Sequence, residues 1–236
     1  MSLRIRPCGP EALLIDLDDI GLVGAVYADL LRLRADGQLP GVQDIVPAAA
    51  TVLLDGVADP RALAARLAEL EPRPQAQLVG DTVEVRARYD GPDLDDVARL
   101  WGVSPADVVR IHCETEFRVA FAGFAPGFGY LVGLPERYAV PRRSTARVAV
   151  PAGAIGLAGA FTGVYPRRSP GGWQLIGTTD AVLWDAERQP PALFVPGTRV
   201  RFVAEDGDQE DGDQVDGDQM TANQAVGHDS KEHGSG

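Results

Sequence analysis

Two segments of this 236-residue chain combine residue types that suit a small ligand, an apolar or planar one for the first segment and a carboxylate or phosphate for the second. The first, FAPGFGYLVGLP (124–135), places three aromatic side chains among glycines, which permit close backbone approach. The second, VPRRSTARVAVPAGAIGLAGAFTGVYPRRSPGGWQLIG (140–177), joins arginines to glycine-rich turns. Arginine binds carboxylate or phosphate through a planar fork, and such turns present backbone N–H groups to anions. Core aromatics and surface arginines would produce the same pattern, so both interpretations stay open.

Arg147 is the arginine that we expect to act on an anion. It lies in ARVAVPAG, where alternation with period two directs it to the face opposite Val148 and Val150. Lysine at this position would keep the charge and lose the bidentate fork, so a functional arginine should not tolerate that change. The alternative is an arginine that merely covers a barrel edge.

His112 and Glu116 form a second candidate group. His112 is the only histidine before the C-terminal segment, and carboxylates at Glu114 and Glu116 follow it closely. A histidine near carboxylates suits general acid–base catalysis. At this helical spacing it also suits a structural role near a helix C-terminus, which the residues alone favour.

Several kinds of chemistry are excluded by composition. The only lysine is Lys231, so residues 1–204 offer no Schiff base, phosphate-loop lysine or biotinyl-lysine. Cys8 and Cys113 are too few and too far apart for a zinc cluster, and no metal site is expected. No GxSxG motif identifies a nucleophilic serine. The chain therefore contains no self-contained hydrolase site that can be read from its sequence.

The net charge of −12 is concentrated in the last 32 residues. Residues 205–236 contain the repeats EDGDQ, EDGDQ and VDGDQ, with ten acids and one base. Because this segment is acidic and Gly-rich, it cannot bury enough apolar surface to fold, and we expect a disordered tail. The charge also argues against nucleic-acid binding. No apolar run reaches membrane-spanning length and no signal core is visible, so a cytoplasmic protein is expected.

Residues 1–89 are expected to form a small α/β domain. A strand at 12–17, a helix at 22–37, strands in VQDIVPA and TVLLDG, a helix opening at Asp59–Pro60 and a strand at 82–90 give the order β-α-β-β-α-β. That order is typical of a ferredoxin-like sandwich.

Residues 90–204 are expected to form a β-barrel preceded by two helices between 93 and 116. Asp93 is a plausible cap for the first helix and Ser104 for the second. The helix pair resembles a DNA-binding motif in outline, but its acids exclude that role. Short β-prone runs follow, separated by Gly and Pro, and indicate the barrel: FRVAFAG, ARVAVPAG, WQLIGTT, AVLWD, ALFVPG and TRVRFVA.

These motifs resemble the family of 5-oxoprolinase B subunits over about residues 5–203. The family is also called allophanate hydrolase subunit 1 or carboxyltransferase subdomains C and D, and includes KipI-like kinase inhibitors. The resemblance implies a small N-terminal α/β domain and a cyclophilin-like barrel. His112, Glu116 and Arg147 are the implied catalytic positions. The implied substrate-binding positions are Phe124, Pro126, Gly127, Phe128, Tyr130, Arg142, Gly153, Thr162, Tyr165, Gly171, Gly172 and Trp173.

The resemblance implies a component of an ATP-dependent enzyme that opens 5-oxo-L-proline to L-glutamate. The C and A subunits of 5-oxoprolinase would be its partners, the substrate a small carboxylate, and the chain alone would be inactive. ATP would be bound by the complex, with no implication that this chain contacts it. Two alternatives stay open. One is a KipI-like regulator that inhibits a sensor histidine kinase, and the other is an allophanate- or urea-type hydrolase or carboxyltransferase subunit.

Overall fold

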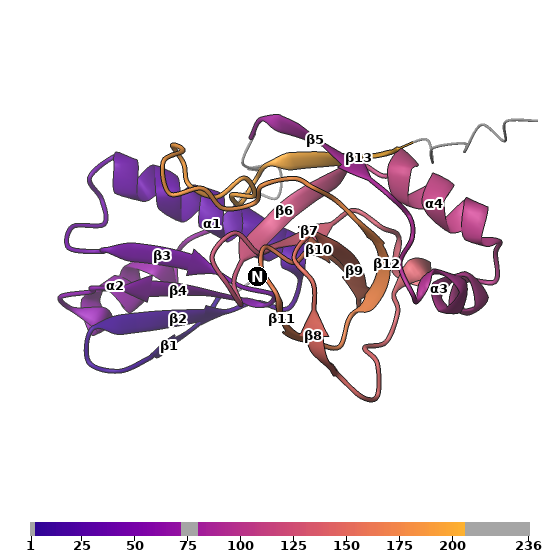
Figure 1. The fold of residues 1–236 in the computed structure, drawn as a ribbon. Coiled ribbons are helices and arrows are strands. Elements are labelled where there is room, and N and C mark those ends of the chain that lie inside the picture. The colour runs from indigo at the N-terminus through magenta and orange to yellow at the C-terminus, as the bar shows by residue number, and fades with distance from the viewer. Residues whose placement is uncertain (1–2, 72–79, 206–236) are drawn as a thin grey trace, which may run out of the picture. The chain divides into compact units, whose positions relative to one another are not determined.

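The computed structural model describes residues 3–71 and 80–205, which contain two main β-sheets (Figure 1). The first is antiparallel throughout, and two helices accompany it, α1 (Ile20–Ala35) and α2 (Pro60–Leu67). In spatial order its strands are β1 (Arg4–Pro7), β2 (Ala12–Asp16), β4 (Thr51–Asp55) and β3 (Asp44–Pro47). Helix α1 contacts β3 and β4, whereas α2 contacts β1 and β2.

Both helices begin at an aspartate cap, of which the sequence analysis predicts only Asp59. The Asp19 carboxylate accepts from the backbone N–H groups of Gly21 and Leu22, and Asp59 accepts in the same way from residues 61 and 62. Pro60 occupies the first turn of α2, where its missing N–H costs nothing. Leucine, isoleucine and valine side chains from the helices and strands then form one buried cluster. The predicted helices of this region are confirmed.

The ferredoxin-like prediction is right for three strands and wrong for the fourth. Strands β2, β3 and β4 with the intervening α1 have the expected arrangement. The edge position beside β2 is taken by β1, through a hairpin that pairs Arg4 with Asp16. Strand β5 (Thr82–Ala87), predicted for that edge, belongs to the second sheet. Alternation correctly identified a half-exposed strand but carries no information on its partner.

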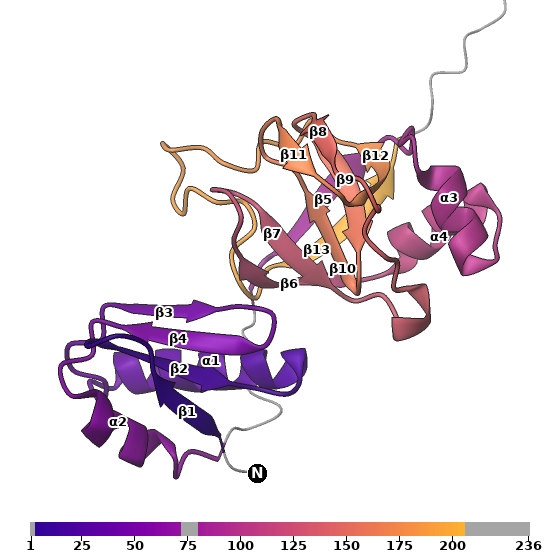
Figure 2. The ribbon, with the colours of Figure 1, turned by 90° about the horizontal axis from the view of Figure 1, so that it is seen from below.

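The second sheet curls into a nearly closed barrel, as expected (Figure 2). Strands β5 and β13 pair in parallel. The strands in spatial order are β12 (Gln174–Thr178), β9 (Ala154–Ala158), β10 (Phe161–Val164), β7 (Gly129–Val132), β6 (Phe117–Ala122), β13 (Arg199–Ala204) and β5. Arg88, directly after β5, exchanges two backbone hydrogen bonds of 2.9 and 2.8 Å with Thr178 of β12. These bonds join the two edges of the sheet.

Three further pieces accompany the barrel. Helices α3 (Leu94–Trp101) and α4 (Pro105–Glu114) lie together and contact β12 and β13 (Figure 1). A short ribbon pairs β8 (Arg147–Val150) with β11 (Ser169–Gly171). A single helical turn, η1 (Glu136–Tyr138), follows β7.

Two predicted strands, in AVLWD and ALFVPG, are not formed between β12 and β13 of the described chain. An isolated bridge between Trp184 and Ala192 joins the two runs in their place. Three prolines, at 190, 191 and 196, remove the backbone donors that a ladder would need.

No helix among residues 3–71 and 80–205 is long and apolar enough to cross a membrane. The predicted disordered tail falls outside the described residues, apart from Glu205.

Gly177 lies at the barrel seam, and its replacement should show how much the closure contributes. A Cβ at Gly177 would collide with the backbone carbonyl of Arg88. We expect Gly177→Ala to lower the free energy of unfolding by about 1–3 kcal/mol, measured by denaturant titration. Gly24→Ala in α1 is the matched control, because nothing lies within 4 Å of its Cβ position. The control should be neutral or gain up to about 1 kcal/mol. Equal behaviour of the two variants would contradict a tight seam.

Candidate functional site

The barrel brings both ligand-binding candidate segments to one pocket of about 190 Å³. The residues that line it come from the β6–β7 loop, from β7, from the segment after η1, from the end of β10, from β11 and from the β11–β12 turn. They are Phe124, Phe128, Tyr130, Arg142, Tyr165, Pro170, Gly171, Gly172 and Trp173. All except Pro170 are among the substrate-binding positions that the sequence predicts. We call this hollow the aromatic pocket.

The floor of the aromatic pocket is a packed aromatic cluster. The Phe128 ring lies edge-on to Tyr130, Tyr165 and Trp173, with centroids 5.0, 5.4 and 5.4 Å away. Phe128, Tyr165 and Trp173 are at most 5% exposed. Phe124 forms part of the rim, because 58% of its surface is exposed. The rings therefore pack in a core, and that core faces a pocket; ligand binding by this segment stays a prediction.

The loop that presents Phe124 depends on unusual backbone conformations. Phe124 has a φ of 66°, in the left-handed region that few non-glycine residues adopt. Gly127 also has positive φ, and a Cβ there would lie 3.0 Å from the Leu183 carbonyl oxygen. Gly171 leaves room for the Tyr165 hydroxyl, which a Cβ would overlap. Burial raises the pKa of Tyr165, so this hydroxyl stays protonated and can donate a hydrogen bond.

Arg142 is the only charged side chain among the described residues that line the aromatic pocket. It is exposed, and the described residues offer it no carboxylate partner. Its positive charge acts on the neighbouring Tyr165 and favours the ionised form of that phenol. An exposed guanidinium beside an aromatic floor can bind a carboxylate through two parallel hydrogen bonds.

Arg147 lies close by but has a different partner. Its Nη2 donates to Asp93 Oδ1 over 2.7 Å, and its Nη1 approaches the Trp173 carbonyl oxygen at 3.4 Å. Arg143 Nη1 donates to the same Asp93 oxygen over 2.6 Å. The predicted catalytic role of Arg147 stays a prediction, and its guanidinium is already bound to a carboxylate that is 1% exposed.

Asp93 is the residue that sequence reasoning assigned to another task. It precedes α3 as expected, yet its side chain makes no capping hydrogen bond. Its Oδ2 instead accepts from the Leu175 backbone N–H over 2.7 Å. One sequence signal for this contact is the glycine at position 91, two residues before Asp93. A Cβ at Gly91 would overlap the backbone of β12, so the chain can approach β12 here only with glycine.

His112 is buried away from the aromatic pocket. Its Nδ1 lies 2.8 Å from the Tyr89 hydroxyl, and its Nε2 lies 3.5 Å from Thr162 Oγ1. Phe117 and Phe202 pack against the ring. Burial lowers the pKa of His112 from 6.5 to about 3, so the imidazole is neutral at ordinary pH. Its predicted role in catalysis stays a prediction.

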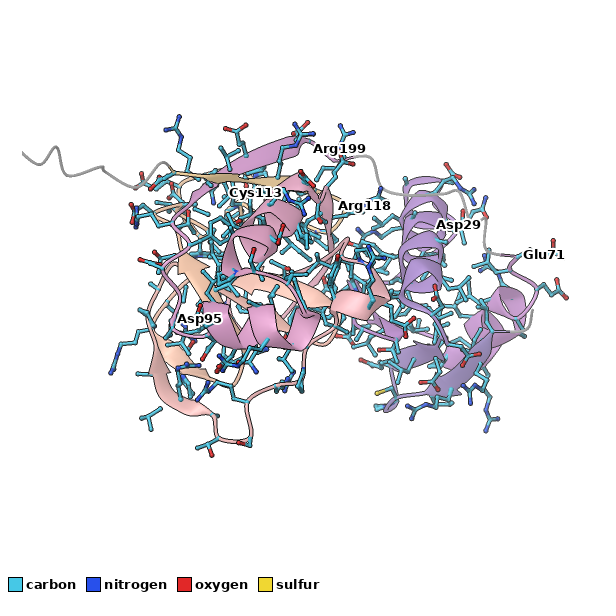
Figure 3. The ribbon with its side chains drawn as sticks, turned by 90° about the vertical axis from the view of Figure 1, so that its right-hand side faces the viewer. Asp29, Glu71, Asp95, Cys113, Arg118 and Arg199 are labelled. Carbon is cyan, nitrogen blue, oxygen red and sulfur yellow. The ribbon has the colours of Figure 1, made fainter. Side chains whose placement is uncertain are left out.

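Tyr89 links this imidazole to Cys113, whose Sγ lies 3.3 Å from the hydroxyl. Figure 3 labels Cys113 on α4. Burial is the main reason that the pKa of Tyr89 is raised, so its O–H stays available as a donor to His112 Nδ1.

The remaining predicted positions lie elsewhere. Glu116 is exposed in the turn between α4 and β6. Gly153 lines a second hollow, of about 300 Å³, that shares Tyr165 with the aromatic pocket. Pro126 and Gly127 belong to the β6–β7 loop, and Thr162 is buried on β10. Among residues 3–71 and 80–205, no group of three or more His, Cys, Asp or Glu side chains could hold a metal ion.

The barrel and its ribbon define a domain class found in other proteins. The chain belongs to the family described as carboxyltransferase domain, subdomain C and D, whose model matches residues 3–194. Two relatives are named as the B subunit of 5-oxoprolinase. The Haemophilus influenzae relative is 40% identical over 71% of this chain and 83% of its own length. The Bacillus subtilis relative is 47% identical over about half of each chain, 51% and 52%. The family resemblance seen in the sequence is confirmed.

Solved structures agree with this assignment. TTHA0988 is similar at a TM-score of 0.66 and 34% identity, over 86% of this chain. The aligned part is 41% of TTHA0988, so this chain spans about two fifths of that longer protein. Kluyveromyces lactis urea carboxylase is similar at a TM-score of 0.62 and 16% identity, which shows a shared fold.

His112 should make stability depend on pH in a defined window. Its pKa is depressed in the folded chain, so below about pH 6.5 the unfolded chain binds a proton that the folded chain does not. Stability is therefore full above that pH and falls as the pH drops toward 3. Between about pH 7 and pH 5 the wild type should lose about 2 kcal/mol more than His112→Gln, measured by denaturant titration. Parallel pH profiles for the two proteins would contradict a buried neutral imidazole.

Proposed function

We propose that this chain is the B subunit of an ATP-dependent 5-oxoprolinase. With the C and A subunits it would open 5-oxo-L-proline to L-glutamate, as water adds to the ring carbonyl and the ring C–N bond breaks. The names of its relatives support this role. The observation that carries the proposal is the aromatic pocket, in which Arg142 is the one charged side chain among the described lining residues.

The pocket suits such a substrate in size and chemistry. 5-Oxoproline has one carboxylate on a small ring with a flat amide. The carboxylate would take the two parallel N–H groups of Arg142, and the ring would pack on the aromatic floor. The Tyr165 hydroxyl, held protonated by burial, would donate to an oxygen of the substrate.

The lining also indicates which groups must come from outside the pocket. Among the described residues that line the pocket there is no lysine, histidine, cysteine or carboxylate. A nucleophile or general base is needed to open an amide, and so is a phosphate-binding group if ATP activates it. These groups would come from the partner subunits, and this chain would bind and orient the substrate.

Reconstitution tests the proposed function. The purified chain alone should show no ATP-driven opening of 5-oxoproline, and activity should appear when it is combined with the C and A subunits. The assay measures glutamate and ADP formation, with ureido compounds as a substrate panel. Turnover by the chain alone would contradict the division of labour. If the complex prefers a ureido compound, that compound and not 5-oxoproline is the substrate.

Arg142→Gln tests the carboxylate site in the reconstituted complex. Loss of the guanidinium should lower kcat/KM for 5-oxoproline at least about tenfold, which corresponds to about 1.4 kcal/mol of barrier. The kcat/KM of Arg142→Lys should lie between those of the wild type and Arg142→Gln, because lysine keeps the charge without the fork. The matched control is Arg137→Gln, an exposed arginine on η1 that lies over the Tyr138 ring outside the pocket. If the two glutamine variants show the same kcat/KM, Arg142 does not hold the substrate.

A further inference from the structure

Asp93 makes contacts on two sides of the aromatic pocket without lining it. Its Oδ1 accepts from Arg143 and Arg147, at 2.6 and 2.7 Å, and its Oδ2 accepts from the Leu175 N–H at 2.7 Å. Arg143 adjoins the pocket residue Arg142, and Leu175 follows the pocket residue Trp173 by two positions. One buried carboxylate therefore holds both chain segments.

Further bonds tie the two segments to each other. The Arg143 N–H donates to the Gly172 carbonyl over 2.8 Å, and Gln174 Nε2 donates to the Pro141 carbonyl over 3.1 Å. Arg147 Nη1 reaches the Trp173 carbonyl at 3.4 Å. Every one of these bonds joins a residue near Arg142 to a residue near Trp173. The distance between the pocket's cation and its aromatic floor is thus set by this group of contacts, which we call the Asp93 clamp.

The same position in the other helices has a different use. Asp19 and Asp59 precede α1 and α2, and each spends its carboxylate on two N–H groups of its own helix. Asp93 precedes α3 in the same way but leaves the cap unmade. A capping aspartate needs no arginine, so helix formation alone does not account for the contacts of Asp93.

Charge gives the clamp a second effect. Arg143 follows the pocket residue Arg142, and Arg147 contacts the carbonyl of the pocket residue Trp173. The single negative charge of Asp93 is shared between these two arginines. A carboxylate already bound to a guanidinium makes that guanidinium less available to a second anion. Arg142, which has no such partner among the described residues, stays the site for an incoming carboxylate.

We propose that Asp93 is a positioning residue for the substrate carboxylate. It holds Arg142 at its place beside the aromatic floor and keeps Arg143 and Arg147 from competing for the anion. The identity of the anion rests on the proposed function, whereas the clamp itself rests on the contacts given above.

Asp93→Asn tests the proposal in the assembled complex. The amide keeps the size of the side chain, removes the charge and leaves both arginines without a carboxylate partner. KM for 5-oxoproline should rise at least about tenfold, while kcat should stay within about threefold, because the change affects substrate position rather than the reacting groups. Arg143→Gln cuts one arm of the clamp from its more exposed side and should raise KM at least about threefold. It serves as the test if Asp93→Asn does not fold.

Two controls separate positioning from stability. Asp96→Asn removes the same charge from α3, the helix that Asp93 precedes, at a half-exposed residue that pairs with Arg99. Val97→Ala opens a cavity at a fully buried position of α3 and lowers stability. It keeps the backbone hydrogen bond from Val97 to the Asp93 carbonyl and removes none of the side-chain contacts of the clamp. Neither should change KM. A rise in KM for Val97→Ala that matches the rise for Asp93→Asn would overturn the proposal.

A double-mutant cycle and an exchange experiment complete the test. If Asp93 acts through Arg147, then Arg147→Lys should raise KM less in the Asp93→Asn background than in the wild type. Amide hydrogen exchange of the full chain needs no substrate. Asp93→Asn should expose the Arg143 amide, whose partner is Gly172, and Val97→Ala should not.

The two proposals fail in different ways. If the assembled wild type does not open 5-oxoproline, the proposed function fails, and amide exchange still tests the clamp. Unchanged protection of the Arg143 amide in Asp93→Asn would overturn the clamp whatever the substrate is.

Discussion

Closure of the barrel depends on two backbone hydrogen bonds between Arg88, directly after β5, and Thr178 of β12. The segment that follows Arg88 continues to bond to β12. Gly91 donates to Ile176, and Asp93 makes backbone and side-chain bonds with Leu175. The seam that closes the sheet therefore continues without interruption into the carboxylate that holds the two arginines. A buried aspartate next to the aromatic pocket is a consequence of how the barrel closes.

Positive charge in this barrel is carried by arginine alone. Because no lysine precedes residue 231, each cation in the barrel is the planar guanidinium of an arginine, and what it contributes depends on the group it binds. Arg143 and Arg147 share one buried carboxylate, Arg88 binds Asp180 and Glu205, and Arg142 faces the pocket. Neighbouring residues of one type thus divide into cations that hold the structure together and a cation that is left for a ligand.

Local elements were predictable to the extent that their signals are local. The caps at Asp59 and Ser104 and the helices that they begin follow from short sequence patterns, whereas the cap at Asp19 was not predicted. The convergence of 124–130 with 171–173 followed from the family resemblance rather than from spacing. The pairing of β5 with β13 could not be predicted, because alternation reports which faces a strand buries and not which strand lies beside it. The sequence pattern gives Asp93 only a capping role, since its arginine partners lie 50 and 54 residues away.

Phe124 joins an unfavourable backbone conformation to an exposed ring. Holding a non-glycine residue in the left-handed region costs on the order of 1 kcal/mol, and an exposed aromatic ring contributes little in return. The folded chain carries this unfavourable conformation before anything binds. A ligand or partner that covers the ring meets a loop already in place, so the entropy of ordering that loop does not weaken the association. The β6–β7 loop is in this sense prepared for contact at the expense of the free chain's stability.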